Sequence, residues 1–185
     1  MQTLIIYGHP NPESSTANKT ILESLKKLEP NVQIRTLADY ISSIGFDIAA
    51  EQNALRNADV VVLQFPLYWY SVPALLKKWI DEVFAHGFAY GTGGTALHGK
   101  QLVLSFTTGA DASSYVKDGA MGWSVEDFMP PLLQTGHLCG FKTVKTIYST
   151  GMMFIPHISS EEDRQDVIKK ASIHAQQLAQ AIAVR

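Results

Sequence analysis

The sequence contains little cysteine and little charge. Cys139 is the only cysteine in 185 residues, which excludes an internal disulfide and fits a reducing, cytoplasmic setting. Charged residues make up 17% of the chain and the formal net charge is -2, so there is no electrostatic footprint for nucleic acid or for an anionic membrane. We therefore expect the binding partner to be a small molecule or another protein, and not a nucleic acid.

Long apolar runs are missing as well. The longest mostly apolar stretch, residues 60–76, is interrupted by Gln64, Ser71 and two prolines, so it is too short and too broken to cross a bilayer. We expect no signal peptide, because the first residues have neither a basic segment nor a long apolar core. Hydrophobic residues still make up 46% of the chain, and no internal repeat or linker divides it. The sequence therefore predicts one domain over residues 1–185 with a substantial core.

Several common catalytic and binding motifs do not occur. There is no G-x-G-x-x-G, P-loop, H-E-x-x-H or G-x-S-x-G pattern, and one cysteine does not make a zinc cluster. A glycine-rich segment lies between His86 and His98, but no strand-then-helix pattern surrounds it. Its length exceeds that of the usual connection, which favours a functional or interface loop. These absences argue against a metal site, a serine hydrolase and a dinucleotide fingerprint.

The chain does contain short β-branched runs that alternate with helical patterns. The expected strands are residues 3–7, 32–37, 59–65, 101–107 and 143–149, and the expected helices are residues 17–28, 49–58, 74–85, 124–139 and 161–184. This alternation predicts a parallel sheet with helices on both faces and right-handed crossovers. The economical choice for five strands is the order 2-1-3-4-5, a flavodoxin-like three-layer α/β sandwich. A ligand would then bind beyond the carboxyl ends of the strands, between the first and the third.

The loop after the first expected strand, HPNPESSTAN, is rich in small polar side chains. The hydroxyl and amide groups of Ser14, Ser15, Thr16 and Asn18 would surround the start of the next helix, where free N–H groups attract a phosphate. The alternative is that one of the hydroxyls only caps the helix.

The loop after the third expected strand, FPLYWYSVP, holds four consecutive large side chains. Leu67, Tyr68, Trp69 and Tyr70 cannot all face one apolar layer, and they lie at the predicted ligand edge. A flat heteroaromatic ligand would use their ring faces and backbone N–H groups. A core or dimer contact is the alternative.

The loop after the fourth expected strand is TTGA, Thr107 to Ala110. Its glycine permits close backbone approach, while threonine hydroxyls and successive N–H groups can donate to the rim of a ring. Alone, such a loop is typical of a plain turn. Together, the three loops predict a site for flavin mononucleotide (FMN).

The segments HPNPESSTANK, PLYWYSVPALLKKWIDEVFAHGFAYG and HGKQLVLSFTTGA resemble the flavodoxin-like NAD(P)H:quinone oxidoreductase family. They are most similar to its short bacterial branch, which includes the ancillary oxidoreductase of the glutathione-gated potassium-efflux system. The resemblance implies FMN as the cofactor, in preference to FAD. The implied cofactor-binding residues are His9, Ser15, Thr16, Ala17, Asn18, Pro66, Leu67, Tyr68, Trp69, Tyr70, Thr107, Thr108, Gly109 and Ala110.

The resemblance also implies a catalytic residue and a homodimer. Longer relatives place a tyrosine and a histidine over the flavin; Tyr115 matches the tyrosine, whereas Met121 stands at the histidine position. The family usually reads TTGG where this chain ends in Ala110. In relatives, the segment corresponding to residues 86–98 lies near the dimer contact and the neighbouring active site.

The implied activity is two-electron hydride transfer from NAD(P)H through FMN to a quinone or a similar small acceptor. An alternative is a flavin-binding regulatory subunit of a potassium-efflux membrane protein, which would place the chain at the inner face of the membrane. A one-electron flavodoxin carrier is a third possibility. The sequence leaves the choice between NADH and NADPH open.

Overall fold

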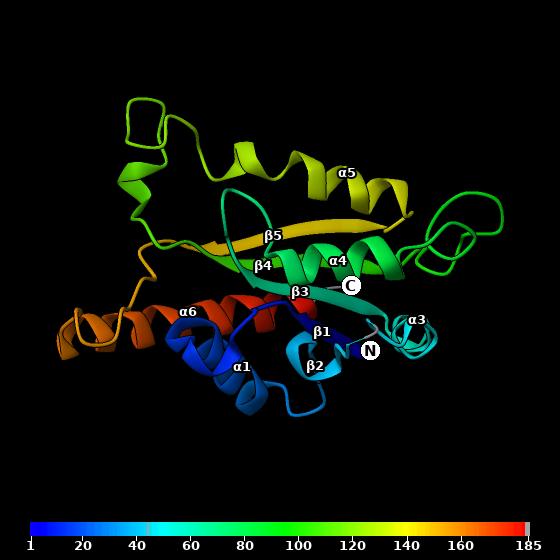
Figure 1. Cartoon of the computed structure of the whole chain (residues 1–185), viewed down its shortest axis with the longest axis horizontal. Helices are drawn as coiled ribbons and strands as arrows, with labels where there is room; N and C mark the ends of the chain where they lie inside the picture. The colour runs from blue at the N-terminus through cyan, green and yellow to red at the C-terminus, as the bar shows by residue number, and fades with distance from the viewer. Residues whose placement is uncertain (44, 184–185) are drawn as a thin grey trace.

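The computed structural model of the chain describes residues 1–43 and 45–183. Its centre is one sheet of five parallel strands in the order β2-β1-β3-β4-β5 (Figure 1). The strands are β1 (Thr3–Tyr7), β2 (Gln33–Thr36), β3 (Val60–Pro66), β4 (Gln101–Thr107) and β5 (Thr143–Ser149). The predicted strand order and flavodoxin-like class are confirmed.

The three central strands β1, β3 and β4 are buried along their whole length. Because successive side chains point to opposite faces of a sheet, Ile5 and Val62 pack into one core, whereas Ile6 and Leu63 pack into the other. This double burial explains why these strands are nearly continuous apolar runs in the sequence.

Helices cover both faces of the sheet, as predicted (Figure 1). One core joins the sheet to α1 (Thr16–Leu28) and α6 (Glu161–Ala183). The other core joins it to α2 (Leu37–Tyr40), α3 (Ile48–Asn57), α4 (Ala74–Val83) and α5 (Pro130–Leu138). Three short 3-10 helices, η1 (Pro12–Ser14), η2 (Ala112–Ser114) and η3 (Glu126–Phe128), lie in the connections.

The predicted bounds agree with the structure to within two residues except over residues 124–139, and Leu37 belongs to a different element. The single helix predicted over residues 124–139 is wrong, because Pro130 and Pro131 have no N–H for a helix that continues from residue 124. They occupy the first turn of α5, where no intrahelical donor is needed. Leu37, predicted to end the second strand, instead begins α2. The predicted last residue of the final helix, Val184, lies outside the described residues.

A buried ion pair ties β2 to the helices on its side of the sheet. The Glu51 carboxylate of α3 is only 1% exposed and accepts hydrogen bonds from Arg35 Nε, at 3.0 Å, and from Trp79 Nε1, at 3.0 Å. The Arg35 guanidinium also lies 4.0 Å from the centre of the Tyr40 ring. We call Arg35, Glu51 and Trp79 the charged cluster.

The two edges of the sheet have different roles. The carboxyl ends of the strands meet at the edge where α6 begins, on the left of Figure 1, and the loops that follow them are neighbours. The glycine-rich segment 86–98 joins α4 to β4 at the opposite edge. It therefore lies away from the predicted site of its own chain.

Candidate functional site

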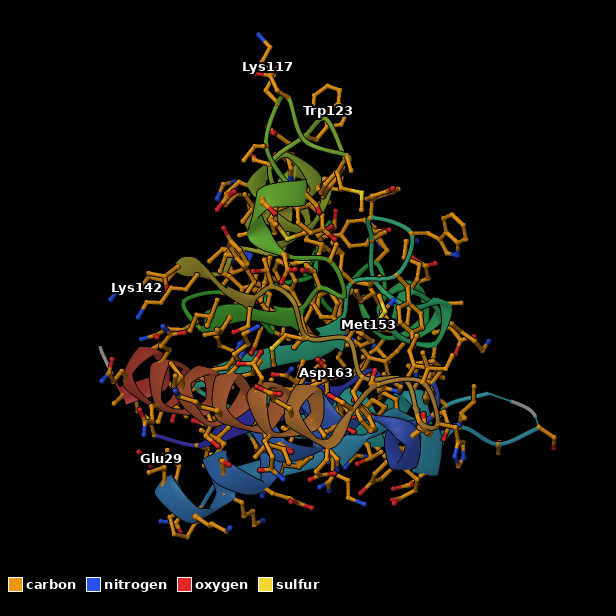
Figure 2. The ribbon with its side chains drawn as sticks, turned by 90° about the vertical axis from the view of Figure 1, so that its left-hand side faces the viewer. Glu29, Lys117, Trp123, Lys142, Met153 and Asp163 are labelled. Carbon is orange, nitrogen blue, oxygen red and sulfur yellow. The ribbon has the colours of Figure 1, made fainter. Side chains whose placement is uncertain are left out.

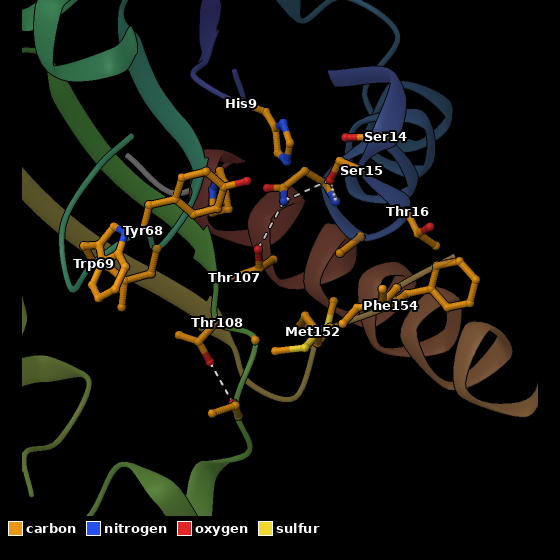
Figure 3. Close-up of a pocket in the computed structure, with 18 of the residues that line it drawn as sticks. His9, Ser14, Ser15, Thr16, Tyr68, Trp69, Thr107, Thr108, Met152 and Phe154 are labelled. Atoms are coloured by element: carbon orange, nitrogen blue, oxygen red, sulfur yellow. Dashed lines mark hydrogen bonds between the residues drawn. The ribbon is translucent and has the colours of Figure 1, made fainter. Parts of the chain in front are cut away.

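A pocket of about 620 Å³ opens at the carboxyl edge of the sheet (Figure 3). Every residue predicted to bind the cofactor lines it, and Tyr115 does too. The volume is within the range of typical small-molecule sites. The structure therefore brings the three predicted loops together around one cavity, and the binding role of each residue stays a prediction.

A fourth loop, residues 152–156 after β5, also lines the pocket and was missed. Its side chains are Met152, Met153, Phe154, Ile155 and Pro156, so this wall is apolar. The signal was available, because the carboxyl end of a fifth parallel strand must lie at the same edge.

The start of α1 offers free hydrogen-bond donors. Ser15 is the N-cap, and its Oγ accepts from the Asn18 N–H at 3.1 Å, so the capping alternative holds for this hydroxyl. The N–H groups of Thr16 and Ala17 precede the first intrahelical bond, and they have no acceptor among the described residues. They are available to an anion at the positive end of the helix dipole.

His9 lies beside these donors and lines the pocket (Figure 3). Burial lowers the pKa of His9, and its Nδ1 accepts a hydrogen bond from the Asn11 N–H at 3.0 Å. The neutral ring therefore carries its hydrogen on Nε2. The described lining residues include no Asp, Glu, Lys or Arg. An anion would be held here by neutral donors.

The aromatic loop after β3 is a tight turn with an unusual backbone. Tyr68 and Ser71 exchange two backbone hydrogen bonds of 2.9 and 3.0 Å, and the residues between them, Trp69 and Tyr70, have φ of 49° and 63°. Large side chains rarely adopt such angles, and strain of this kind is concentrated at functional sites. The Trp69 side chain is 93% exposed, and the Trp69 and Tyr70 N–H groups have no acceptor in the described part of the chain. Both residues line the pocket, so the Trp69 ring and the two N–H groups are open to a ligand.

Thr107, the last residue of β4, and Thr108, the first residue after it, have different hydrogen-bond partners (Figure 3). The Thr108 hydroxyl donates to the Ala110 carbonyl at 3.0 Å, so it is committed within its own loop. Its donation to a ligand stays a prediction, and it would require this bond to break. Thr107 Oγ1 accepts from Asn18 Nδ2 at 3.1 Å, and the N–H groups of Gly109 and Ala110 have no acceptor within residues 1–43 and 45–183.

The residues expected over the pocket lie on the segment after η2. Tyr115 is half-buried, and its ring makes a T-shaped contact with Phe128. Met121 Sδ lies 3.4 Å from the Tyr70 hydroxyl, which donates to it. The Tyr70 hydroxyl hydrogen is therefore taken, whereas the Tyr115 hydroxyl has no partner among the described residues.

The arrangement suits a flat ring with a phosphate at one end. Free N–H groups lie at both ends of an uncharged cavity, and aromatic and apolar walls lie between them. In the part of the chain that the structure describes, no three His, Cys, Asp or Glu side chains gather to hold a metal ion. No described helix is both long and apolar enough to cross a membrane. The site can therefore bind and orient a ligand whose own chemistry does the work.

Known proteins of similar sequence and structure share this fold. The family profile described as a flavodoxin-like fold matches residues 1–177. General stress protein 14 of Treponema denticola, solved in complex with FMN, is 33% identical, with 98% of this chain and 99% of that chain covered and a TM-score of 0.82. A thermophilic tryptophan halogenase from Streptomycin violaceusniger is 30% identical, covering 93% and 96% with a TM-score of 0.78. An NADPH-quinone reductase from P. pentosaceus is 26% identical, covering 95% and 98% with a TM-score of 0.73.

Proposed function

Since the chain belongs to the family with the flavodoxin-like fold, we propose that it is an FMN-dependent NAD(P)H oxidoreductase. It would transfer two electrons as hydride from NAD(P)H to the flavin and then to a quinone or a similar small acceptor. The observation that carries the proposal is the set of free N–H groups at both ends of a neutral, partly aromatic pocket. The FMN complex of the Treponema denticola protein supports the cofactor, and the quinone reductase supports the reaction. Because one fold serves many reactions, the halogenase likeness by itself transfers no activity.

The start of α1 would hold the phosphate of FMN. Three donors are available there: the N–H groups of Thr16 and Ala17 and the Nε2–H of the neutral His9 ring. All three keep their hydrogen across neutral pH. The Ser15 hydroxyl keeps the helix start in place through its bond to the Asn18 N–H. This end of the pocket fixes the position of the cofactor along its length.

The other two predicted loops would orient the ring. Tyr68 and Trp69 provide the wall, and the N–H groups of Gly109 and Ala110 can donate to oxygen or nitrogen atoms on the rim of the ring. FMN held there would supply the redox chemistry, which is hydride transfer. The protein supplies stacking, orientation and exclusion of water by the apolar segment 152–156.

Tyr115 would serve the acceptor. Its hydroxyl has no partner among the described residues, and its ring is held by Phe128. It can therefore donate a hydrogen bond to the oxygen of a quinone as that oxygen gains electron density. Met121 at the neighbouring position offers no proton, so no second relay group is assigned there.

An absorbance spectrum tests this proposal directly. The purified protein is reconstituted with FMN, gel-filtered, and mixed with NADPH or NADH without oxygen. We expect retained flavin bands that bleach within seconds and return when a quinone is added, and the faster donor is the preferred one. Failure to retain FMN would overturn the site, and retained FMN that neither donor bleaches would overturn the reaction.

We also propose that two copies of the chain associate. Trp69 is 93% exposed and Trp123 is 61% exposed. Figure 2, which looks onto the carboxyl edge, shows Trp123 at the outer end of the segment after β4. Burial of such side chains is a common source of interface energy. Sedimentation equilibrium should give twice the mass of the chain. The double variant Trp69→Ser, Trp123→Ser should give a lower average mass.

The regulatory alternative stays a prediction. No described residue and no comparison bears on a potassium-efflux partner. Co-purification with such a transporter would favour it.

A further inference from the structure

A chain of buried neutral side chains connects the pocket to the middle of α6. Asn18, Gln64, Ser105 and His174 are all 2% exposed or less. We call the connected set the buried chain. Its successive hydrogen-bond distances are 3.1 Å for Thr107–Asn18, 2.8 Å for Asn18–Gln64, 2.6 Å for Gln64–Ser105, 2.8 Å for Ser105–His174 and 2.9 Å for His174–Ser149.

The buried chain could run in either of two directions, because amides and hydroxyls both donate and accept. In one direction Asn18 Nδ2 gives both of its hydrogens, to Thr107 Oγ1 at 3.1 Å and to Ser15 Oγ at 3.3 Å. In the opposite direction the amide nitrogen would face Gln64 alone, and one buried N–H would lose its acceptor. An unsatisfied buried donor costs more than a typical hydrogen bond contributes. The first direction is therefore the stable one.

This direction decides the state of His174. Gln64 donates to Asn18 Oδ1, so its own Oε1 accepts the Ser105 hydroxyl hydrogen. Ser105 Oγ has no second hydrogen to give, and it must accept from His174 Nε2–H. Burial lowers the pKa of His174 to about 4, so the ring is neutral and its Nδ1 accepts from the Ser149 hydroxyl.

At the pocket end, the direction leaves one hydrogen free. Thr107 Oγ1 already accepts from Asn18, and its own hydrogen has no acceptor among the described residues. Thr108 differs, because its hydroxyl donates within the loop. We infer that His174 is a positioning residue: by donating from Nε2 to Ser105, it completes the direction that is set at Asn18. It thereby helps to hold the Thr107 hydroxyl as a donor to a carbonyl oxygen or ring nitrogen of FMN. The identity of that ligand rests on the proposed function.

A matched pair of serine substitutions on the same histidine tests the inference. Ser105→Ala cuts the buried chain between His174 and the pocket, whereas Ser149→Ala removes only the bond on the far side of the ring. Neither residue lines the pocket. The dissociation constant for FMN, measured by quenching of flavin fluorescence, should rise about threefold to tenfold in Ser105→Ala. It should stay within about a factor of two in Ser149→Ala, because the direction of the buried chain is kept.

The midpoint potential of the bound flavin is a second readout. A hydrogen bond to the ring stabilises the electron-rich reduced form, so the potential should fall in Ser105→Ala and hold in Ser149→Ala. Equal shifts in affinity and potential for the two variants would overturn the inference and leave the proposed function standing. Failure of the unaltered protein to bind FMN would overturn both.

The state of the ring can be observed without any cofactor. Long-range ¹H–¹⁵N spectra of the protein without FMN distinguish the two neutral tautomers, and the signals that vanish in His174→Gln identify the residue. We expect the Nε2–H tautomer at pH 7. An Nδ1–H tautomer or a charged ring would contradict the direction assigned to the buried chain, even if the serine variants do not fold.

Discussion

Two buried polar clusters lie on opposite faces of the sheet, and they use opposite chemistry. The charged cluster of Arg35, Glu51 and Trp79 pairs a cation with a carboxylate. The buried chain on the α1 and α6 side contains only neutral groups. No member of the charged cluster lines the pocket, whereas Asn18 and Thr107 of the buried chain do.

The difference shows how each kind of cluster contributes. A buried ion pair holds elements together strongly, because the loss of either partner leaves a charge without compensation. A neutral chain costs less to bury, and its donors and acceptors have a direction that can be passed from one residue to the next. We therefore expect the charged cluster to control stability and the buried chain to control the ligand.

The largest effect should come from Glu51→Ala. Arg35 and the Trp79 N–H would lose their shared partner, and the free energy of unfolding should fall by about 3 kcal/mol. Urea denaturation measures this value, and Glu51→Gln, which keeps an acceptor for Trp79, should cost less. The affinity of the folded variant for FMN should equal that of the unaltered protein. A loss below about 1 kcal/mol, or weaker FMN binding, would contradict the assignment.

Acid should act through the buried chain. The pKa of His174 is about 4 in the folded protein, against about 6.5 when unfolded. Between these pH values the unfolded state binds a proton at this ring and the native state does not. Stability conferred by the neutral ring is complete above about pH 6.5 and is lost as pH falls to about 4, a change of about 3 kcal/mol. Urea denaturation at several pH values should show this slope, and the slope should shrink in His174→Gln. If His174→Gln has the same pH dependence as the unaltered protein, another group causes the slope.

Thr107, at the end of β4, and Thr108, in the loop that follows, should likewise differ in their effect on FMN affinity. Thr107→Val keeps the shape and removes the free hydroxyl, so FMN should bind about tenfold more weakly, which corresponds to about 1.4 kcal/mol. Thr108→Val breaks a bond within the loop and should change affinity less. Fluorescence titration of both variants decides the point, and a larger effect at Thr108 would reverse the assignment of the donor.

The smallest effect should be confined to one substrate. Tyr115→Phe removes the proposed donor to the quinone oxygen and leaves the ring packed on Phe128. Stopped-flow mixing should show unchanged reduction of bound FMN by NAD(P)H and severalfold slower reoxidation by a quinone. If both steps slow equally, Tyr115 holds the flavin and does not serve the acceptor.

Much of the fold and most of the pocket were predictable from the sequence. Three of the five strands, β1, β4 and β5, have the predicted bounds, and the strand order and the three loops at the carboxyl edge followed from the alternation of strands and helices. These properties are local, because the period of apolar residues and the turn residues between elements act over a few positions. The packing of strands into a parallel sheet then places their carboxyl ends at one edge.

Only the tertiary structure decided what the polar residues inside the core do. Gln64, Ser105 and His174 lie on β3, β4 and α6, and successive bonds of the buried chain join residues 46, 41 and 69 positions apart. The apolar loop 152–156 joined the site in the same way, through the position of its strand in the sheet. A hydrogen bond depends on the distance and orientation of both partners. The sequence determined which groups could donate or accept, and the folded arrangement determined to which partner and in which direction.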